Sequence, residues 1–414
     1  MLIKKVSVFW WFFCVAASLQ AQLPKVELGV DVFFKEQGIK ELKGKRVGLV
    51  TNHTGVNSQL RSTISLFLDQ SSGVKLVALF APEHGIHGGG YAWEHIDDNK
   101  TLRGIPIYSL HGATRRPTAH MLKGIDVLVY DIQDIGCRSY TYTTTLFYVM
   151  EEAAKYHIPV IVLDRPNPIN GLIVDGPMLE EKWRSFIGYL NVPYCHGMTI
   201  GELAEFFNQH YGIGCQLKVI SMKGWKRWMS YKDTGLYWVP TSPQIPEEDS
   251  PLFYATTGVL GELSIVNIGI GYTLPFKVVG APWIEGQTFA ARLNDQNLPG
   301  VRFFPFYYRP FYGLYKGEEC QGVLILVTNS QTYRPFLVQH MLIGLLKNLY
   351  PKQIESRLAA LEQAKKTLFC KANGNEELLN ILFKEKYIAW KMILFQKKDR
   401  ELFVKERHRY LLYK

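Results

Sequence analysis

Residues 46–55, Arg46-Val-Gly-Leu-Val-Thr-Asn-His-Thr-Gly55, join an apolar run to a polar end. A short apolar run that stops at turn-forming residues is typical of a strand buried on both faces of a parallel sheet. The same pattern recurs in the first half of the chain at Lys75–Pro82, Val127–Asp131 and Pro159–Asp164. We predict that these four segments are strands of one sheet.

Segments with the apolar spacing of amphipathic helices alternate with these strands, namely Leu60–Gln70, Thr144–Tyr156 and Thr199–Tyr211. Strands that alternate with helices are typical of an α/β fold. The pattern therefore predicts a doubly wound, mostly parallel sheet in a Rossmann-like N-terminal domain.

The second part of the chain has a different pattern, with short predicted strands at Leu263–Ile268, Lys277–Ala281 and Cys320–Val327. Predicted helices follow at Pro335–Tyr350, Ile354–Leu361 and Asn375–Phe383. Between the two parts, Pro240–Pro251 is rich in proline and polar residues, a composition typical of a linker. We predict a Rossmann-like catalytic domain over residues 22–245 and a smaller α+β domain over residues 246–414.

The N-terminus has the pattern of a secretory signal peptide. Lys4 and Lys5 precede an apolar run from Val6 to Ala17, and small residues end at Ala21. We predict a signal peptide over residues 1–21 and a periplasmic or secreted protein, with an uncleaved anchor as the alternative. No later segment approaches the roughly 18 apolar residues of a spanning helix, so we expect no stable membrane span after cleavage.

The net charge and the number of cysteines indicate which partners and which cross-links to expect. Lys and Arg number 47 against 37 Asp and Glu, and the net charge of +10 favours acidic partners. Five of the six cysteines lie outside the predicted signal peptide. An odd and small number excludes a disulfide framework, and we expect at most one disulfide, with Cys195 and Cys215 the favoured pair.

The loop after the second predicted strand contains the first candidate catalytic group, in the stretch Ala81-Pro-Glu-His-Gly85. In open α/β sheets, ligands bind outside the carboxyl ends of the strands. Glu83 is a candidate general acid or base there, and the alternative is that Glu83 only caps the following turn. His84 and His87, with His95 nearby, lack the order of a zinc protease motif, so we expect hydrogen-bonding histidines and no metal.

Three further loops at the same sheet edge offer candidate substrate contacts. Polar and aromatic side chains together are typical of sugar-binding sites. Arg138 either binds a substrate carboxylate with two hydrogen bonds or holds the loop in an Asp–Arg pair. The candidates are Asn52, His53, His84, Asp131, Gln133, Asp134, Arg138, Tyr140, Asp164, Arg165 and Asn167.

Several common catalytic patterns are missing from the sequence. There is no G-x-S-x-G stretch, no phosphate-binding loop, and no G-x-G-x-x-G after the first predicted strand. Serine-hydrolase and nucleotide chemistry are therefore disfavoured.

Motifs in all four loops resemble those of the exo-β-N-acetylmuramidase (NamZ-like) family, formerly a domain of unknown function. The resemblance covers essentially the whole mature chain. It implies release of terminal N-acetylmuramic acid from peptidoglycan fragments, with no cofactor and no nucleic-acid partner. The residues that carry it are Gly48-Leu-Val-Thr-Asn-His-Thr-Gly55, Ala81-Pro-Glu-His-Gly85, Asp131-Ile-Gln-Asp-Ile-Gly136 with Arg138 and Tyr140, Leu163-Asp-Arg-Pro-Asn-Pro168, and Pro240-Thr-Ser-Pro243.

Two mechanisms are compatible with such an enzyme. Glu83 acts as acid or base in both. Either Asp131, Asp134 or Glu262 serves as the nucleophile or base, or the acetamido group of the substrate attacks. A non-catalytic cell-wall sugar-binding protein with the same crevice is the alternative function.

The stretch Gly269-Ile-Gly-Tyr-Thr273 departs from the resemblance, because the family pattern has arginine where this chain has Ile270. Isoleucine offers no donor to the lactyl carboxylate of a muramic acid. We therefore predict altered specificity or reduced activity, unless Ile270 lies in packed core.

Overall fold

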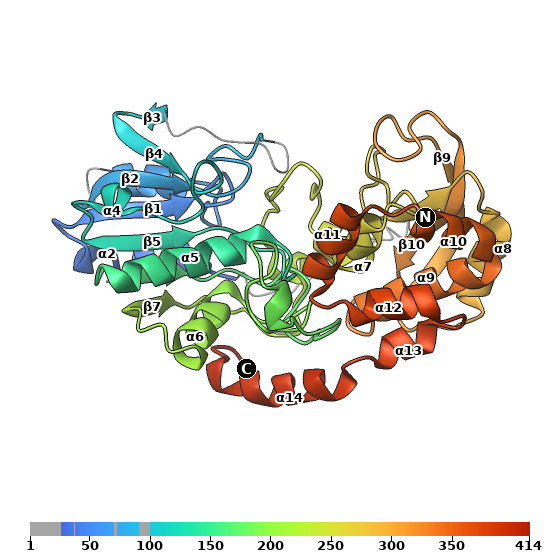
Figure 1. The fold of residues 1–414 in the computed structure, drawn as a ribbon. Coiled ribbons are helices and arrows are strands. Elements are labelled where there is room, and N and C mark those ends of the chain that lie inside the picture. The colour runs from blue at the N-terminus through green and yellow to red at the C-terminus, as the bar shows by residue number, and fades with distance from the viewer. Residues whose placement is uncertain (1–25, 37, 70–72, 91–99) are drawn as a thin grey trace, which may run out of the picture.

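The computed structural model describes residues 26–36, 38–69, 73–90 and 100–414, in two sheets with flanking helices (Figure 1). The predicted signal peptide lies outside the described residues. The larger sheet has seven strands in the order β3 (Lys100–Leu102), β4 (Ile105–Ser109), β2 (Lys75–Ala81), β1 (Arg46–Thr51), β5 (Val127–Asp131), β6 (Val160–Leu163) and β7 (Leu217–Ile220). All neighbouring pairs are parallel except β3 with β4.

Alternate side chains of the central strands enter two different cores. Val47 and Leu49 of β1 pack with Phe33 and Phe67 on one face of the sheet, whereas Val50 belongs to the core on the other face. The helices of this domain are α1 (Gly29–Lys35), α2 (Gly38–Glu41), α3 (Thr63–Leu68), α4 (Ala119–Leu122), α5 (Thr141–Lys155) and α6 (Ile200–His210). The predicted doubly wound fold is confirmed.

In the larger sheet, the four predicted strands match observed ones closely, but three strands were not predicted, and β9 (Val301–Tyr308) of the smaller sheet was not predicted either. β4 contains Pro106, which is uncommon inside a sheet, and β7 is only half-buried and exposes Lys218. Neither segment therefore has the continuous apolar run on which the prediction depended. β3 has only three residues.

The smaller domain is built on an antiparallel sheet in the order β8 (Val278–Ala281), β10 (Cys320–Val327) and β9 (Val301–Tyr308). Its helices are α7 (Ser250–Glu262), α8 (Gly286–Asn294), α9 (Pro335–Leu349), α10 (Pro351–Ala359), α11 (Gln363–Asn373), α12 (Glu377–Lys384), α13 (Ala389–Leu394) and α14 (Lys397–Arg407). Short 3₁₀ turns occur at Glu181–Trp183, Tyr231–Thr234 and His408–Tyr410.

The prediction of a strand at Leu263–Ile268 is wrong, because these residues form turns after α7 and only Asn267 bridges to Gly280. Helix α7 was not predicted. Most of its side chains are buried, so the helix has no polar face to give an amphipathic period.

The segment between the domains is packed and not a free linker. Thr241 and Ile245 are buried, and one hydrophobic cluster runs from Phe147 of α5 through Val259 of α7 to Phe336 of α9. The two parts of the chain therefore share a core.

The C-terminal segment returns from the smaller domain to the first one, beside α6 (Figure 1). The Tyr413 hydroxyl donates to Asp164 Oδ2 at 2.5 Å and accepts from the amide of Met222 at 2.9 Å. Arg407 donates to the carbonyl oxygen of His196 at 2.9 Å. These contacts hold the chain end against the loop that follows β6.

Cys195 and Cys215 do not form the expected disulfide, since every cysteine in the described part of the chain is a free, buried thiol. Among the described residues, no helix has the length and apolar character needed to cross a membrane.

We predict that Tyr413→Phe lowers the free energy of unfolding by about 1–3 kcal/mol, because the buried amide of Met222 loses its acceptor and Asp164 Oδ2 keeps only the hydroxyl of Thr199 as a donor. Denaturant unfolding measures the change. Tyr387→Phe is the matched control, since Tyr387 is 71% exposed. Equal stability of Tyr413→Phe and the wild type would contradict the proposed anchoring.

Candidate active site

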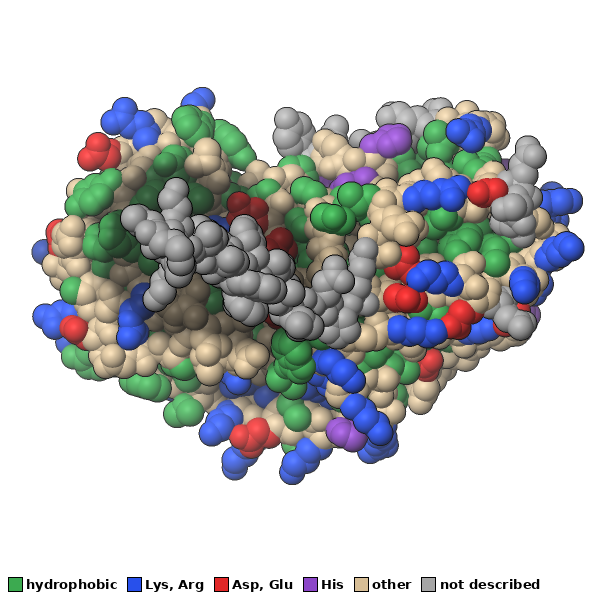
Figure 2. Space-filling model, turned by 180° about the vertical axis from the view of Figure 1, so that it is seen from behind, with side chains coloured by type: hydrophobic (Ala, Val, Ile, Leu, Met, Phe, Trp, Pro, Cys, Tyr) green, Lys and Arg blue, Asp and Glu red, His purple; other side chains and the backbone are tan. Residues whose placement is uncertain are grey.

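A pocket of about 580 Å³ lies between the two domains and is lined by both. This volume is in the range of sites for small molecules, about 300–1,000 Å³. Seen from behind, the molecule has a hollow in which acidic side chains lie among hydrophobic ones (Figure 2). The polar lining residues include Glu83, His84, Ser139, Tyr140, Thr141, Ser242, Gln244, Tyr254, Glu262, Asn267 and Tyr312.

Glu83 follows β2 and lies in the pocket wall with 6% of its surface exposed. The Thr141 hydroxyl, at the first turn of α5, donates to Glu83 Oε2 at 2.7 Å. His111 Nε2, after β4, lies 3.6 Å from Glu83 Oε1. Two side chains, one that follows β4 and one at the start of α5, thus hold the carboxyl group of Glu83 in place.

The loop after Glu83 has a constrained backbone. His84 adopts φ +70°, a left-handed conformation that is uncommon for residues other than glycine and stores strain. Its ring Nδ1 donates to the carbonyl oxygen of Gly90 at 2.8 Å. His84 also lines the pocket, so the strain lies beside the candidate acid.

The imidazole ring of His53 packs against this loop at Gly88. A Cβ added at Gly88 would lie 2.0 Å from the His53 ring, so only glycine fits there. His53 Nε2 donates to the carbonyl oxygen of Pro240 at 2.5 Å, and burial lowers the pKa of its imidazole. His53 is not among the described residues that line the pocket, and its contacts hold the loop after Glu83.

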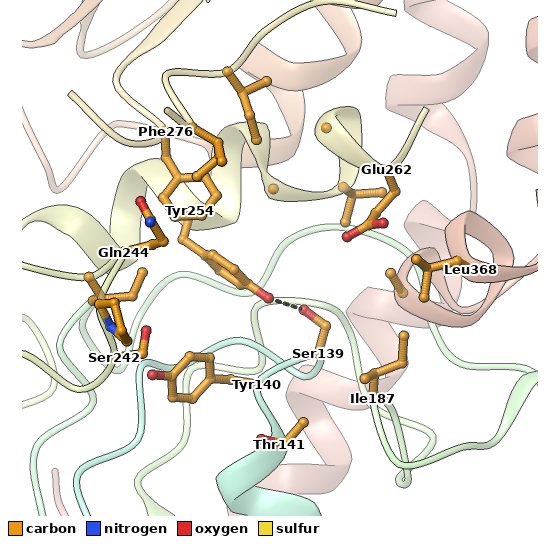
Figure 3. Close-up of a pocket in the computed structure, with 18 of the residues that line it drawn as sticks. Ser139, Tyr140, Thr141, Ile187, Ser242, Gln244, Tyr254, Glu262, Phe276 and Leu368 are labelled. Carbon is orange, nitrogen blue, oxygen red and sulfur yellow. Dashed lines mark hydrogen bonds between the residues drawn. The ribbon is translucent and has the colours of Figure 1, made fainter. Parts of the chain in front are cut away.

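Two tyrosines at the start of α5 bond to the segment between the domains. Tyr140 donates to Thr241 Oγ1 at 2.9 Å, and Tyr142 donates to the carbonyl oxygen of Thr241 at 2.7 Å. The hydroxyls of Ser139 and Tyr254 lie 3.0 Å apart (Figure 3). Burial raises the pKa of Tyr140, so its hydroxyl stays protonated.

Asp131 is buried under the pocket and not in its wall. Its Oδ1 accepts from Arg165 Nε at 2.6 Å, and its other oxygen accepts from the Thr63 hydroxyl. Arg165 also donates to the carbonyl oxygen of Val56 at 2.7 Å. Within the described chain, neither Asp131 nor Arg165 lines the pocket. A catalytic role for Asp131 is therefore not supported by its position.

The remaining predicted polar residues also bond within the protein. Asp134 Oδ2 accepts from the amide of Gly136 at 2.7 Å, and burial raises its pKa to about 7. Asp164 Oδ1 accepts from the amide of Gly201 at 2.7 Å, and burial raises its pKa to about 7. Asn52, Gln133 and Asn167 bond to Thr54, Pro166 and Met198, respectively. These side chains order the loops, and none is among the described lining residues.

Arg138 was predicted either to bind a substrate carboxylate or to pair with an aspartate, and its position fits neither role. The guanidinium is buried and donates to the carbonyl oxygens of Pro177, Val192, Ala372 and Asn373 at 2.6–3.3 Å. Burial lowers its pKa to about 10. Arg138 ties the loop after β5 to the end of α11.

We predict that Arg138→Ala lowers the free energy of unfolding by about 3 kcal/mol or more, because several buried carbonyl oxygens lose their donor. Arg309→Ala is the control, since the Arg309 side chain is 64% exposed. A stable Arg138→Ala protein with only a raised KM would favour substrate binding by Arg138 instead.

Glu262 ends α7 and is the second carboxylate that lines the pocket. Its carboxyl group faces the interior, across from Tyr140 (Figure 3). Burial raises its pKa. Of the predicted catalytic residues, the structure brings Glu83 and Glu262 together and leaves Asp131 outside.

Ile270 is half-buried and lines the same pocket, so its side chain is not confined to packed core. Its backbone carbonyl oxygen accepts from Asn267 Nδ2 at 2.9 Å. The position at which the resemblance predicts an arginine therefore lines the pocket in this chain.

Among the described residues, no group of three or more His, Cys, Asp and Glu side chains is placed to hold a metal ion. His87 is exposed. His95, the third histidine of the alternative metal cluster, lies outside the described residues.

The sequence analysis missed His111, Thr141, Tyr254 and Gln244. His111 follows β4, which was not predicted, and Tyr254 lies on α7, which was also missed. The sequence does contain a pattern that indicates His111 as a site residue, because Ser109-Leu-His-Gly112 is another polar segment at the end of a strand.

The chain thus combines a doubly wound domain, whose sheet edge presents a buried glutamate to a pocket, with a second domain that lines the same pocket. The chain belongs to the NamZ family. The model of the exo-beta-N-acetylmuramidase NamZ N-terminal domain matches residues 47–249, and the model of the C-terminal domain matches residues 252–413.

Similar proteins support the assignment of the chain to this family. The chain is 42% identical over 338 residues to the peptidoglycan beta-N-acetylmuramidase NamZ of Bacillus subtilis (strain 168), covering 81% of this chain and 80% of that protein. Two crystal structures of DUF1343 family proteins from Bacteroides fragilis NCTC 9343 are similar, each aligned over 94% of this chain and 99% of theirs. One has a TM-score of 0.88 at 41% identity, and the other has 0.71 at 27%.

Proposed function

We propose that this protein is an exo-acting glycosidase that releases terminal N-acetylmuramic acid from peptidoglycan fragments. Family membership and the relative from Bacillus subtilis support the reaction class. The observation that carries the proposal is the position of Glu83, which is held by Thr141 and lies in the pocket wall.

Glu83 is the proposed general acid. Glycoside hydrolysis needs a proton on the leaving oxygen as the bond to the sugar carbon breaks, and a carboxylic acid within hydrogen-bond reach supplies it. The Thr141 hydroxyl bonds to Oε2, and His111 Nε2 lies near Oε1. These contacts fix the direction of the carboxyl group before substrate enters.

The positions of the three candidate carboxylates favour one of them as the second catalytic group. Asp131 is paired with Arg165, and Asp134 caps the amide of Gly136. Glu262 lines the pocket together with Glu83. We therefore propose Glu262 as the protein's second carboxylate, with attack by the substrate's acetamido group as the competing route.

We predict that Glu83→Gln lowers kcat by 10²–10⁴-fold, because the amide is nearly isosteric but cannot transfer a proton. Release of N-acetylmuramic acid from a chromogenic N-acetylmuramide measures the loss. An unchanged melting temperature shows that the variant is folded. Near-wild-type turnover would remove Glu83 from the mechanism.

Glu262→Gln is the companion variant in the same assay. A loss similar to that of Glu83→Gln assigns the second step to Glu262, whereas retained turnover assigns it to the acetamido group. Tight binding of the sugar by wild-type protein without release would favour the alternative function, a cell-wall sugar-binding protein.

We predict that Ile270→Arg improves discrimination between N-acetylmuramides and N-acetylglucosaminides, because arginine binds the lactyl carboxylate through charge-assisted hydrogen bonds. The ratio of kcat/KM for the two chromogenic substrates measures the effect. Ile270→Lys is the control for charge alone, since lysine lacks the planar fork. A folded Ile270→Arg variant with an unchanged ratio would count against recognition at this position.

We propose that the protein acts outside the cytoplasm, in the periplasm or the surrounding medium. The supporting observation is the N-terminal pattern of Lys4 and Lys5 followed by an apolar run.

A further inference from the structure

Four aromatic side chains, two exposed and two half-buried, lie beside the pocket on the smaller domain. We call Tyr272, Phe306, Phe311 and Tyr312 the aromatic rim. Phe311 and Tyr312 are 67% and 50% exposed. The Tyr272 and Phe311 rings stack with centroids 6.1 Å apart and an interplanar angle of 22°, and Phe306 lies 6.3 Å from Tyr272. Phe306 lies in β9, and Phe311 and Tyr312 follow this strand in the chain.

The aromatic rim continues into the pocket wall. Tyr312 lines the pocket, and Gln244 Nε2 donates to its hydroxyl at 2.8 Å. Ile270 and Leu314, the neighbours of the rim along the chain, line the pocket as well. A ligand that fills the pocket and extends past Tyr312 therefore reaches the loop that carries Phe311.

The loop that carries Phe311 and Tyr312 is firmly held. The Gly317 amide donates to the carbonyl oxygen of Pro310 at 2.9 Å and closes the loop. The Phe311 amide donates to the carbonyl oxygen of Gly271 at 2.6 Å, where an added Cβ would lie 1.9 Å from the carbonyl oxygen of Tyr312. These contacts fix the backbone of the loop while its aromatic side chains stay exposed.

Connected aromatic surface on a fixed backbone is typical of a binding site, because exposed apolar patches are otherwise avoided. Pyranose rings present apolar C–H faces, which pack on aromatic faces. We propose that the aromatic rim binds the sugars on the leaving side of the scissile bond, so that the enzyme prefers glycan chains over single-sugar substrates. This inference rests on the proposed function, which places the terminal sugar in the pocket.

The test compares two substrates of the full-length protein. One is a nitrophenyl N-acetylmuramide, which has no second sugar, and the other is a tetrasaccharide from peptidoglycan with a terminal N-acetylmuramic acid. Phe311→Ala is expected to lower kcat/KM for the tetrasaccharide roughly threefold to tenfold, mainly through KM, because one stacking partner is lost. Activity on the single sugar stays within about twofold of the wild type, since the described lining of the pocket does not include Phe311.

Phe311→Trp keeps an aromatic face and is expected to retain the preference for the tetrasaccharide. Tyr387→Ala is the matched control, because Tyr387 is 71% exposed and lies between α12 and α13. Melting temperatures show that the variants are folded. If Phe311→Ala is unfolded, Phe311→Leu replaces it and the same loss is expected.

Equal activity of Phe311→Ala and wild type on both substrates would overturn the inference and leave the proposed function intact. Equal losses on both substrates would also overturn it, because they indicate a general effect on the pocket. If the wild type hydrolyses neither substrate, the proposed function itself fails.

Discussion

Thr241 attaches the segment between the domains to the first domain, next to the pocket-lining residue Ser242. The Thr241 hydroxyl accepts a hydrogen bond from Tyr140, and its carbonyl oxygen accepts one from Tyr142. Both phenols lie where the loop after β5 enters α5, and Thr141 between them holds Glu83. The same few residues therefore attach the segment between the domains and orient the candidate acid.

The polar residues at the sheet edge divide into two groups with different roles. Glu83 and Tyr140 face the pocket, together with Glu262 from the smaller domain. Asp131 and Arg165 form a buried ion pair below them. A buried polar group must find a partner, so most polar residues in such loops bond to the protein and few are left for substrate.

The sequence was sufficient to predict the central strands and the position of Glu83 directly after one of them, because continuous apolar runs followed by polar loops are local patterns. The sequence was not sufficient to predict the contacts of Arg138. Two of its four carbonyl partners, Ala372 and Asn373, are more than 230 residues away in the chain. Helix α7 was missed because it is buried on nearly all sides. Glu262 was named from the resemblance alone, and its place in the pocket follows from the packing of α7 against the first domain.

The central claim is that the terminal N-acetylmuramic acid occupies the pocket between Glu83 and Glu262. A crystal structure of the Glu83→Gln protein with a disaccharide that carries this sugar at its non-reducing end tests it most directly. We expect the sugar in the pocket, the glycosidic oxygen within hydrogen-bonding distance of residue 83, and Arg138 still bonded to its carbonyl oxygens. A disaccharide bound over the Asp131–Arg165 pair, or away from Glu262, would contradict the account.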